Sequence, residues 1–189
     1  MQTLPQFIEE ALREPRPQAF GERLGAPEWR YLSSHGMLER AKAIAVALRY
    51  SGVQRGDRVA LISNNRIDWL AANFGILIAG CVVVPIFATL APDQTDYIFL
   101  DSDAKLAFAE KPEDVERLRA SCPHMPRAIH FDGAGPDSLA TFESAGKAHL
   151  TKGPAIVGTF TDGMTPDTDG ITPDDLAVLI YTSGTTGNP

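Results

Sequence analysis

The sequence predicts an α/β fold in which a mostly parallel sheet carries helices on both faces. Short apolar segments rich in β-branched residues alternate with segments whose apolar residues recur every three or four positions. This alternation is typical of strand–helix–strand units. With 189 residues, 44% of them apolar, the chain is long enough to bury a core. We therefore expect a globular protein built mainly as one domain.

The first two predicted helices have recognisable ends. Residues 6–13 show a short helical pattern, which two following prolines close. Ser33 or Ser34 can cap a second helix that runs to about Tyr50, and Gly52 stands where a C-terminal cap belongs. The apolar stripe of this helix consists of Leu38, Ala41, Ile44, Ala45 and Leu48.

The middle of the chain alternates regularly between strand and helix. The predicted strands are residues 58–63, 81–84, 105–109 and 128–131, and the helices between them begin near residues 66, 92 and 112. Each helix would return the chain to the end of the sheet at which the preceding strand began, so neighbouring strands would be parallel. Ser138 follows in a stretch that reads as ordinary surface.

An uncharged stretch from Leu70 to Ala91 is long enough to cross a bilayer. Its first part has a single apolar face, and Gly80 separates that part from the β-branched residues 81–84. We expect a helix followed by a buried strand, and a transmembrane span is the less favoured alternative.

The C-terminal part begins with a loop and ends with an apolar run. Residues 158–175 are rich in Thr, Asp, Gly and Pro, which predicts a loop. Residues 176–181, LAVLIY, form a continuous apolar run, which predicts one fully buried strand. This strand leads directly into Thr182 and the hydroxyl- and glycine-rich residues after it.

The net charge indicates which binding partners are disfavoured, and the cysteines indicate the cellular compartment. The formal net charge of −7 disfavours nucleic acid or an anionic membrane surface as the main partner. Cys81 and Cys122 lie far apart, and the first residues lack the pattern of a secretory leader, so reduced thiols in a cytoplasmic protein are expected. The four histidines have no ligand spacing with either cysteine, so no metal site is expected.

The loop after the last apolar run is suited to holding phosphate. Glycines let backbone N–H groups approach an anion closely, and Ser and Thr hydroxyls add uncharged donors. The loop is not a Walker loop, because Gly184 and Gly187 enclose two residues where a Walker loop needs four. The alternative interpretation is a flexible polar tail, which a directly preceding core strand disfavours.

Three other segments have competing interpretations. Residues 55–57 spell Arg-Gly-Asp, which a plain β-turn explains better than an adhesion motif. Asn64, Asn65 and Arg66 either contact a ligand or cap a helix, and the sequence favours neither reading. Trp69 is expected to pack against the core rather than to line a substrate site.

The residues YTSGTTGNP at positions 181–189 resemble the phosphate-binding signature of the adenylate-forming (AMP-binding) superfamily. This superfamily includes acyl-CoA synthetases, luciferases and peptide-synthetase adenylation domains. The upstream segments GVQRGDRVALISNNRIDWL and AGCVVVPIFATLAPDQTDYIFLDSDAKLAFA resemble those of the family in the same order. The Asn65-Arg66-x-x-Trp69 element and the final segment are most similar to the long-chain fatty-acid branch.

The resemblance implies that residues 1–189 are part of the large N-terminal, AMP-binding domain of a longer enzyme. The family's lysine after the proline would be residue 190, so the chain would end inside its phosphate-binding loop, with the C-terminal domain absent. Neither a catalytic residue nor a metal ligand is expected in this part, which alone would be inactive. The implied nucleotide-binding residues are Thr182, Ser183, Gly184, Thr185, Thr186 and Gly187.

The implied parent activity is that of a long-chain fatty-acid–CoA ligase. Such an enzyme uses ATP, Mg²⁺ and coenzyme A to convert a fatty acid into acyl-AMP and then acyl-CoA. Its partners would be these small molecules and not nucleic acid, in the cytoplasm, with peripheral contact to the inner face of the membrane left open. An aryl-CoA ligase, a peptide-synthetase adenylation domain, a non-catalytic nucleotide-binding domain and a structural fragment without binding remain as alternatives.

Overall fold

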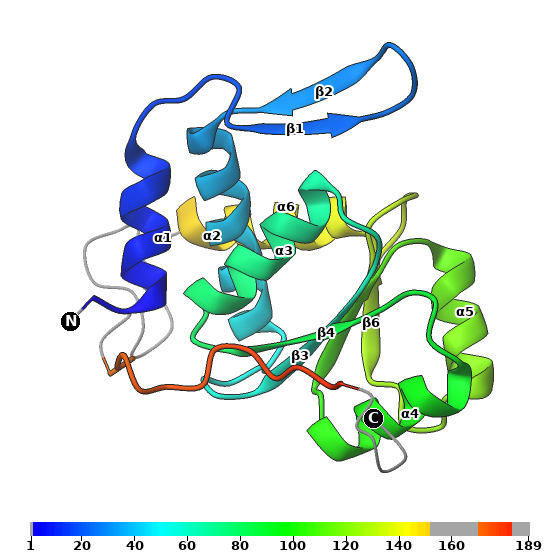
Figure 1. The fold of residues 1–189 in the computed structure, drawn as a ribbon. Coiled ribbons are helices and arrows are strands. Elements are labelled where there is room, and N and C mark those ends of the chain that lie inside the picture. Colours follow the sequence, from blue (N-terminus) through cyan, green and yellow to red (C-terminus); the bar gives the residue numbers. More distant parts are fainter. Residues whose placement is uncertain (1, 152–169, 183–189) are drawn as a thin grey trace.

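The computed structural model describes residues 2–151 and 170–182, which form an α/β fold (Figure 1). The helices are α1 (Leu4–Arg13), α2 (Ser34–Tyr50), α3 (Ile67–Ile78), α4 (Pro92–Ser102), α5 (Pro112–Ser121) and α6 (Leu139–Thr151). The strands are β1 (Phe20–Arg23), β2 (Trp29–Leu32), β3 (Arg58–Ile62), β4 (Val82–Ile86), β5 (Leu106–Ala109) and β6 (Arg127–His130).

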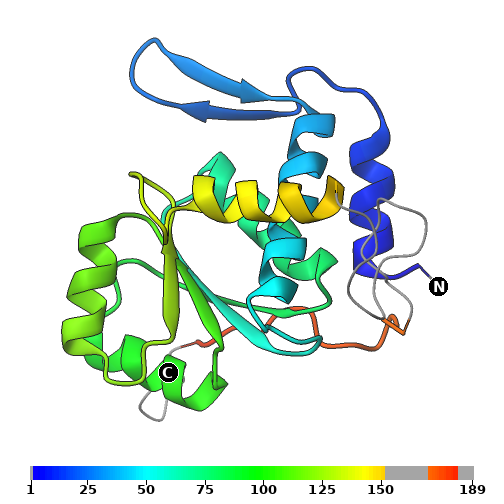
Figure 2. The same ribbon diagram turned by 180° about the vertical axis from the view of Figure 1, so that it is seen from behind.

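The main sheet is parallel and has the strand order β4-β3-β5-β6. Helices α2, α3 and α6 cover one face of this sheet, and α4 and α5 cover the other (Figures 1 and 2). The predicted fold class is confirmed.

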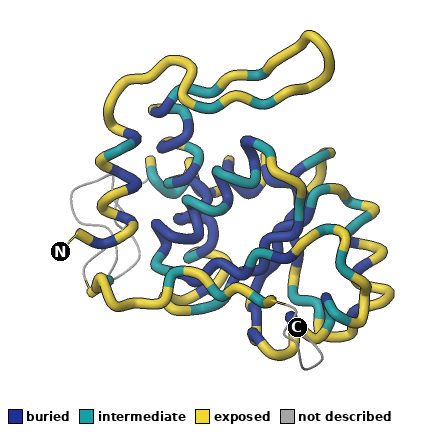
Figure 3. The backbone as a smooth tube through the Cα atoms, in the orientation of Figure 1, coloured by how far each residue is buried: buried dark blue, intermediate teal, exposed yellow. Residues whose placement is uncertain are grey.

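Two apolar clusters lie on opposite faces of the central strand β3. Val59 and Leu61 face the cluster under α2 and α3, whereas Ala60 and Ile62 face the cluster under α4 and α5. Figure 3 shows the resulting dark band of buried backbone through the sheet and its covering helices. A strand buried on both faces needs apolar residues at every position, which explains the continuous apolar run VALI at residues 59–62, all of them buried.

The boundaries of α2 follow its capping residues. The Ser33 side chain accepts a hydrogen bond from the Gly36 N–H, and Ser33 is therefore the N-cap. At the other end, the N–H of Gly52 donates to the Arg49 carbonyl and the N–H of Val53 to the Leu48 carbonyl. This is a Schellman motif, and it needs the positive φ of 89° that Gly52 adopts. The predicted end of this helix is confirmed.

The uncharged stretch from residue 70 to residue 91 is divided as expected. It contains most of α3, a turn at Gly80 with φ of 70°, and the buried strand β4. Among the described residues, no helix is both long and apolar enough to cross a bilayer.

Two elements were not predicted, the β1–β2 hairpin and α6. The hairpin strands are four residues each and bury only one face, so their sequence pattern is weak. Helix α6 was hidden by its small residues and by the interpretation of Ser138 as surface, which is wrong. Ser138 is buried, and its hydroxyl accepts a hydrogen bond from the Thr141 N–H at the start of α6.

The apolar run at residues 176–181 is not the fully buried strand that its composition predicts. It lies parallel to β4 through a single bridge between Val83 and Val178, and its side chains alternate in exposure. Ala177, Leu179 and Tyr181 pack against the core, whereas Leu176, Val178 and Ile180 are exposed. The predicted loop before it, at residues 158–175, is described only from residue 170, where Thr172 and Asp175 form a turn.

The ladder between this run and β4 ends because β4 contains a proline. The Val83 N–H donates to the Ala177 carbonyl, and the Leu179 N–H donates to the Val83 carbonyl, both at 2.9 Å. The next donor in a parallel ladder would be the backbone nitrogen of Pro85, which carries no hydrogen. Backbone pairing therefore stops after one repeat, and the run has no regular strand.

Gly146 sets how closely α6 approaches α2. A Cβ atom at this position would overlap the backbone carbonyl of Ala43, which belongs to the core of α2 and cannot move alone. We expect Gly146→Ala to lower the free energy of unfolding by at least about 1–3 kcal/mol, measured by urea denaturation. Gly25→Ala is the control, because a Cβ atom there meets no atom within 4 Å. Equal stability of the two variants would contradict the close contact.

Candidate functional site

Of the six predicted phosphate-binding residues, the structure describes only the first, Thr182. Thr182 is exposed and follows Tyr181 at the end of the run that lies beside β4. Ser183, Gly184, Thr185, Thr186 and Gly187 lie outside the described residues. Because the run is parallel to β4, the chain approaches this loop in the direction of the carboxyl end of that strand, the side where open α/β sheets bind ligands.

Directly before residues 176–181, the turn at residues 172–175 is bound by an ion pair to the loop that precedes β3. The carboxylate of Asp175 accepts hydrogen bonds from the Thr172 N–H and hydroxyl, and it pairs with Arg55 at 2.5 Å. Arg55 belongs to the Arg-Gly-Asp tripeptide, which forms the predicted β-turn, since the Asp57 N–H donates to the Gln54 carbonyl. This turn therefore has a structural role.

The sheet also has a topological switch point, between β3 and β5. After β3 the chain turns to α3 on one face, and after β5 it turns to α5 on the other. Diverging connections of this kind open a crevice at the carboxyl ends of the two strands, where doubly wound proteins commonly bind nucleotides. A nucleotide bound in the manner of these doubly wound proteins would lie in this crevice.

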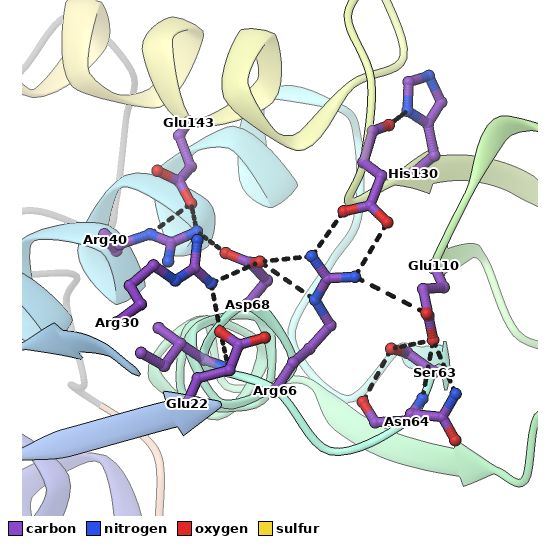
Figure 4. A network of polar contacts seen from close by, with 12 residues as sticks. Glu22, Arg30, Arg40, Ser63, Asn64, Arg66, Asp68, Glu110, His130 and Glu143 are labelled. Atoms are coloured by element: carbon purple, nitrogen blue, oxygen red, sulfur yellow. Dashed lines mark hydrogen bonds and ion pairs between the residues drawn. The ribbon is translucent and has the colours of Figure 1, made fainter. Parts of the chain in front are cut away.

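In this chain a carboxylate of the protein itself occupies the switch point. Glu110, directly after β5, accepts hydrogen bonds from the Asn64 N–H at 3.2 Å, the Asn64 amide at 3.1 Å and the Ser63 hydroxyl at 3.3 Å (Figure 4). These are donors from the end of β3 that a phosphate would otherwise use. The negative charge of Glu110 opposes an anion there, which disfavours the non-catalytic alternative at this crevice.

Next to Glu110 lies a network of ion pairs that joins distant parts of the chain (Figure 4). Its centre is Asp68 on α3, whose carboxylate contacts Arg40 at 2.7 Å and both Arg30 and Arg66 at 3.1 Å. The network continues from these arginines to Glu22 on β1, Glu143 on α6, Glu110 after β5 and Asp132 after β6. It thus connects the hairpin, the three helices α2, α3 and α6, and the ends of two strands.

The electrostatics of the network shift the pKa of Asp68 and of the three arginines toward their charged states. Burial alone would raise the pKa of Asp68, but hydrogen bonds and charges from Arg40 and Arg30 outweigh it and hold that pKa below its ordinary value. The two-pronged hydrogen bond to Asp132 raises the pKa of Arg66. The paired groups of this network join distant elements and stabilise the fold, although the buried Nε of Arg30 has no hydrogen-bond partner.

The sequence predicted neither the network nor the role of Asn64. Arg66 occupies the N-cap position of α3 but makes no side-chain cap bond, and the Asn64 side chain binds Glu110, so neither side chain caps the helix. Trp69 packs against the core, as predicted. A signal was available, because Asn64, Glu110 and Asp132 each come within two residues of the end of a strand. Within residues 2–151 and 170–182, no group of three or more His, Cys, Asp or Glu residues could hold a metal ion.

Comparison with known proteins identifies the family. The sequence model of the AMP-binding enzymes matches residues 7–189, nearly the whole chain. The chain belongs to the AMP-binding enzyme family. This match includes the residues that we predicted to bind phosphate, and it confirms the resemblance inferred from the sequence.

Curated relatives in this family include long-chain-fatty-acid–CoA ligases. FadD15 of Mycobacterium bovis is 33% identical over 171 residues, which cover 89% of this chain and 27% of the relative. FadD13 of Mycobacterium tuberculosis is 30% identical over 177 residues, which cover 93% of this chain and 31% of the relative. The AMP-binding chain described here thus spans about a third or less of the length of these relatives.

Solved structures of AMP-binding enzymes share the fold. VinN in complex with L-aspartate has a TM-score of 0.76 at 25% identity, and the match covers all of this chain and 46% of VinN. The fatty acyl-adenylate ligase from L. pneumophila, with acyl adenylate and pyrophosphate, has a TM-score of 0.73 at 23% identity and is matched over 29% of its length. The anthranilate CoA ligase AuaEII has a TM-score of 0.63 at 23% identity.

Proposed function

We propose that this chain is the N-terminal part of an ATP-dependent acyl-CoA synthetase that activates a long-chain fatty acid. The observation that carries the proposal is the family match through the loop residues 182–187, together with 33% identity to a long-chain-fatty-acid–CoA ligase. Residues 1–189 would be part of the AMP-binding domain, and the C-terminal domain of the enzyme would follow beyond residue 189.

In the proposed reaction, a carboxylate oxygen of the acid attacks the α-phosphorus of ATP, and the bond to the β-phosphate breaks. Pyrophosphate leaves, and the product acyl-AMP is a mixed anhydride. The thiolate of coenzyme A then attacks the acyl carbon, and the bond to AMP breaks. Negative charge accumulates on the departing pyrophosphate, where uncharged donors fixed in advance stabilise it.

The loop would supply these donors. Thr182 is exposed at the end of an anchored segment, and the hydroxyls and backbone N–H groups of residues 183–187 would surround the β- and γ-phosphates. ATP and coenzyme A would be substrates, with Mg²⁺ as the cofactor. We assign no step to magnesium in this part of the chain, because the described residues contain no suitable ligand cluster.

We further propose a cytoplasmic location. The free thiols of Cys81 and Cys122 agree with a reducing compartment. Peripheral contact with the inner face of the membrane would suit an enzyme whose substrate partitions into lipid.

The substrate class is tested by ATP–pyrophosphate exchange in the enzyme that carries this chain. We expect exchange with palmitate and decanoate to exceed exchange with benzoate, anthranilate and free amino acids by at least about tenfold. Preference for benzoate or anthranilate would favour an aryl-CoA ligase, and preference for an amino acid would favour a peptide-synthetase adenylation domain. ATP binding without exchange for any acid would leave a non-catalytic nucleotide-binding domain.

A further inference from the structure

The residue that precedes the predicted phosphate loop is anchored on α4 by its side chain. The phenol of Tyr181 donates a hydrogen bond to the carboxylate of Asp101 at 2.6 Å, across 80 positions of sequence. Its ring meets the ring of Tyr97 edge to face, with 6.4 Å between centroids and 90° between planes. Tyr181 also packs against the apolar cluster under α4 and α5. Three contacts therefore fix the position of this one side chain.

The anchor stands where backbone pairing has already ended. Leu179 makes the last backbone hydrogen bond between the run and β4, because Pro85 cannot donate the next one. Two residues then separate Leu179 from Thr182, and one of them, Ile180, is exposed. Among the described residues, the contacts of Tyr181 therefore fix the chain next to Thr182.

The hydrogen bond is of a kind that can hold such a position. An O–H donor to a carboxylate forms a shorter and stronger bond than a neutral pair. Burial and the neighbouring Asp101 carboxylate raise the pKa of Tyr181, so the phenol keeps its proton and remains a donor throughout the neutral range.

We propose that Asp101 is a positioning residue for ATP, acting through Tyr181 to orient Thr182, the first of the proposed phosphate-binding residues. Asp101 itself need not touch the nucleotide. This inference rests on the proposed function and adds to it a residue of α4 that lies far from the loop in sequence. A misplacement of about 1 Å of groups that hold a reacting substrate can cost about a hundredfold in rate.

The test compares three variants of the enzyme that carries this chain. Asp101→Leu and Tyr181→Phe remove the hydrogen bond, whereas Asp101→Asn keeps an acceptor oxygen for the phenol. We expect the first two to raise the KM for ATP about tenfold or more while the KM for the fatty acid stays within about twofold. The KM for ATP of Asp101→Asn should lie close to the wild-type value. Asp93→Asn, a charge removal at the exposed first turn of α4, is the control.

A double variant and a titration separate positioning from general stability. Tyr181→Phe combined with Asp101→Leu should be no worse than either alone, because both remove the same bond. Ultraviolet titration of tyrosine should show the pKa of Tyr181 falling toward its ordinary value in Asp101→Leu, with the signal assigned by its loss in Tyr181→Phe. The titration needs no nucleotide and is informative even if one variant is inactive.

The outcomes distinguish this inference from the proposed function. An unchanged KM for ATP in Asp101→Leu and Tyr181→Phe, in an enzyme that Gly187→Val inactivates, would overturn the positioning role alone. An equal rise in both KM values with a lower melting temperature would show a merely structural contact and would also overturn it. Normal activity of Gly187→Val would instead remove the proposed ATP site.

Discussion

Gly187→Val is expected to lower fatty-acid-dependent ATP–pyrophosphate exchange by about a hundredfold to a thousandfold, the effect of losing one strong donor to a developing charge. Valine adds a β-branched side chain where backbone N–H groups would approach the phosphates. Thr185→Ala and Thr186→Ala should each lose activity as well, because each removes a hydroxyl donor. The measurement is exchange in the enzyme that carries this chain, run beside thermal melts, in which the melting temperature should hardly change.

Matched controls exist in the described part of the chain. Gly25→Val places the same side chain in a hairpin turn with open space around it. Ser121→Ala removes an exposed hydroxyl that donates to the Arg117 carbonyl within α5 and otherwise contacts the neighbouring Cys122 sulfur at 3.9 Å. Both should keep normal exchange. Near-normal exchange in Gly187→Val and in both threonine variants would mean that this loop does not hold the phosphates.

Asp68→Ala should lower the free energy of unfolding by about 3–5 kcal/mol, because it leaves Arg30, Arg40 and Arg66 without their shared buried carboxylate. Chemical denaturation of this chain measures the effect. Asp137→Ala, which breaks an exposed pair with Arg127, is the control and should cost less than about 1 kcal/mol. Similar losses in the two variants would show that the network around Asp68 contributes little to stability.

The pH dependence of Asp68→Asn follows from the sign of the shift. The folded pKa of Asp68 lies below the ordinary value of 3.8, so its ionised form stabilises the fold fully above that pH. The contribution is lost as pH falls through the lower folded value, where the carboxylate takes up a proton. The difference in stability between the wild-type protein and Asp68→Asn should therefore be constant near neutral pH and shrink below about pH 3.8. A constant difference down to the acid transition would contradict this assignment.

The order of strands and helices in the middle of the chain could be predicted because each element has a local signal. Strands buried on both faces read as β-branched runs, as in residues 82–84, and helices carry stripes or caps, as at Ser33 and Gly52. The run at 176–181 was misjudged because composition cannot show that Pro85, on the neighbouring strand, lacks the donor that would continue the ladder.

The candidate sites differ in how far their residues can be found from the sequence. The loop residues 182–187 form one contiguous motif that can be recognised without a structure. The Asp68 network and the Asp101–Tyr181 bond join residues up to 103 positions apart, as between Arg40 and Glu143. Single charged residues in separate helices have no local pattern that pairs them, so only the fold brings them together.

Pro85 also affects how the molecule behaves toward other copies of itself. An uncovered sheet edge is a template onto which foreign strands can add, and this is a common route to aggregation. If residues 176–181 detached from β4, the exposed edge would carry three consecutive valines, residues 82–84, which are uncharged and have a high β-propensity. The proline after them limits an incoming strand to the same single repeat that the native run forms. Pro85, which ends the backbone pairing with residues 176–181, thus also limits the aggregation of the protein through this edge.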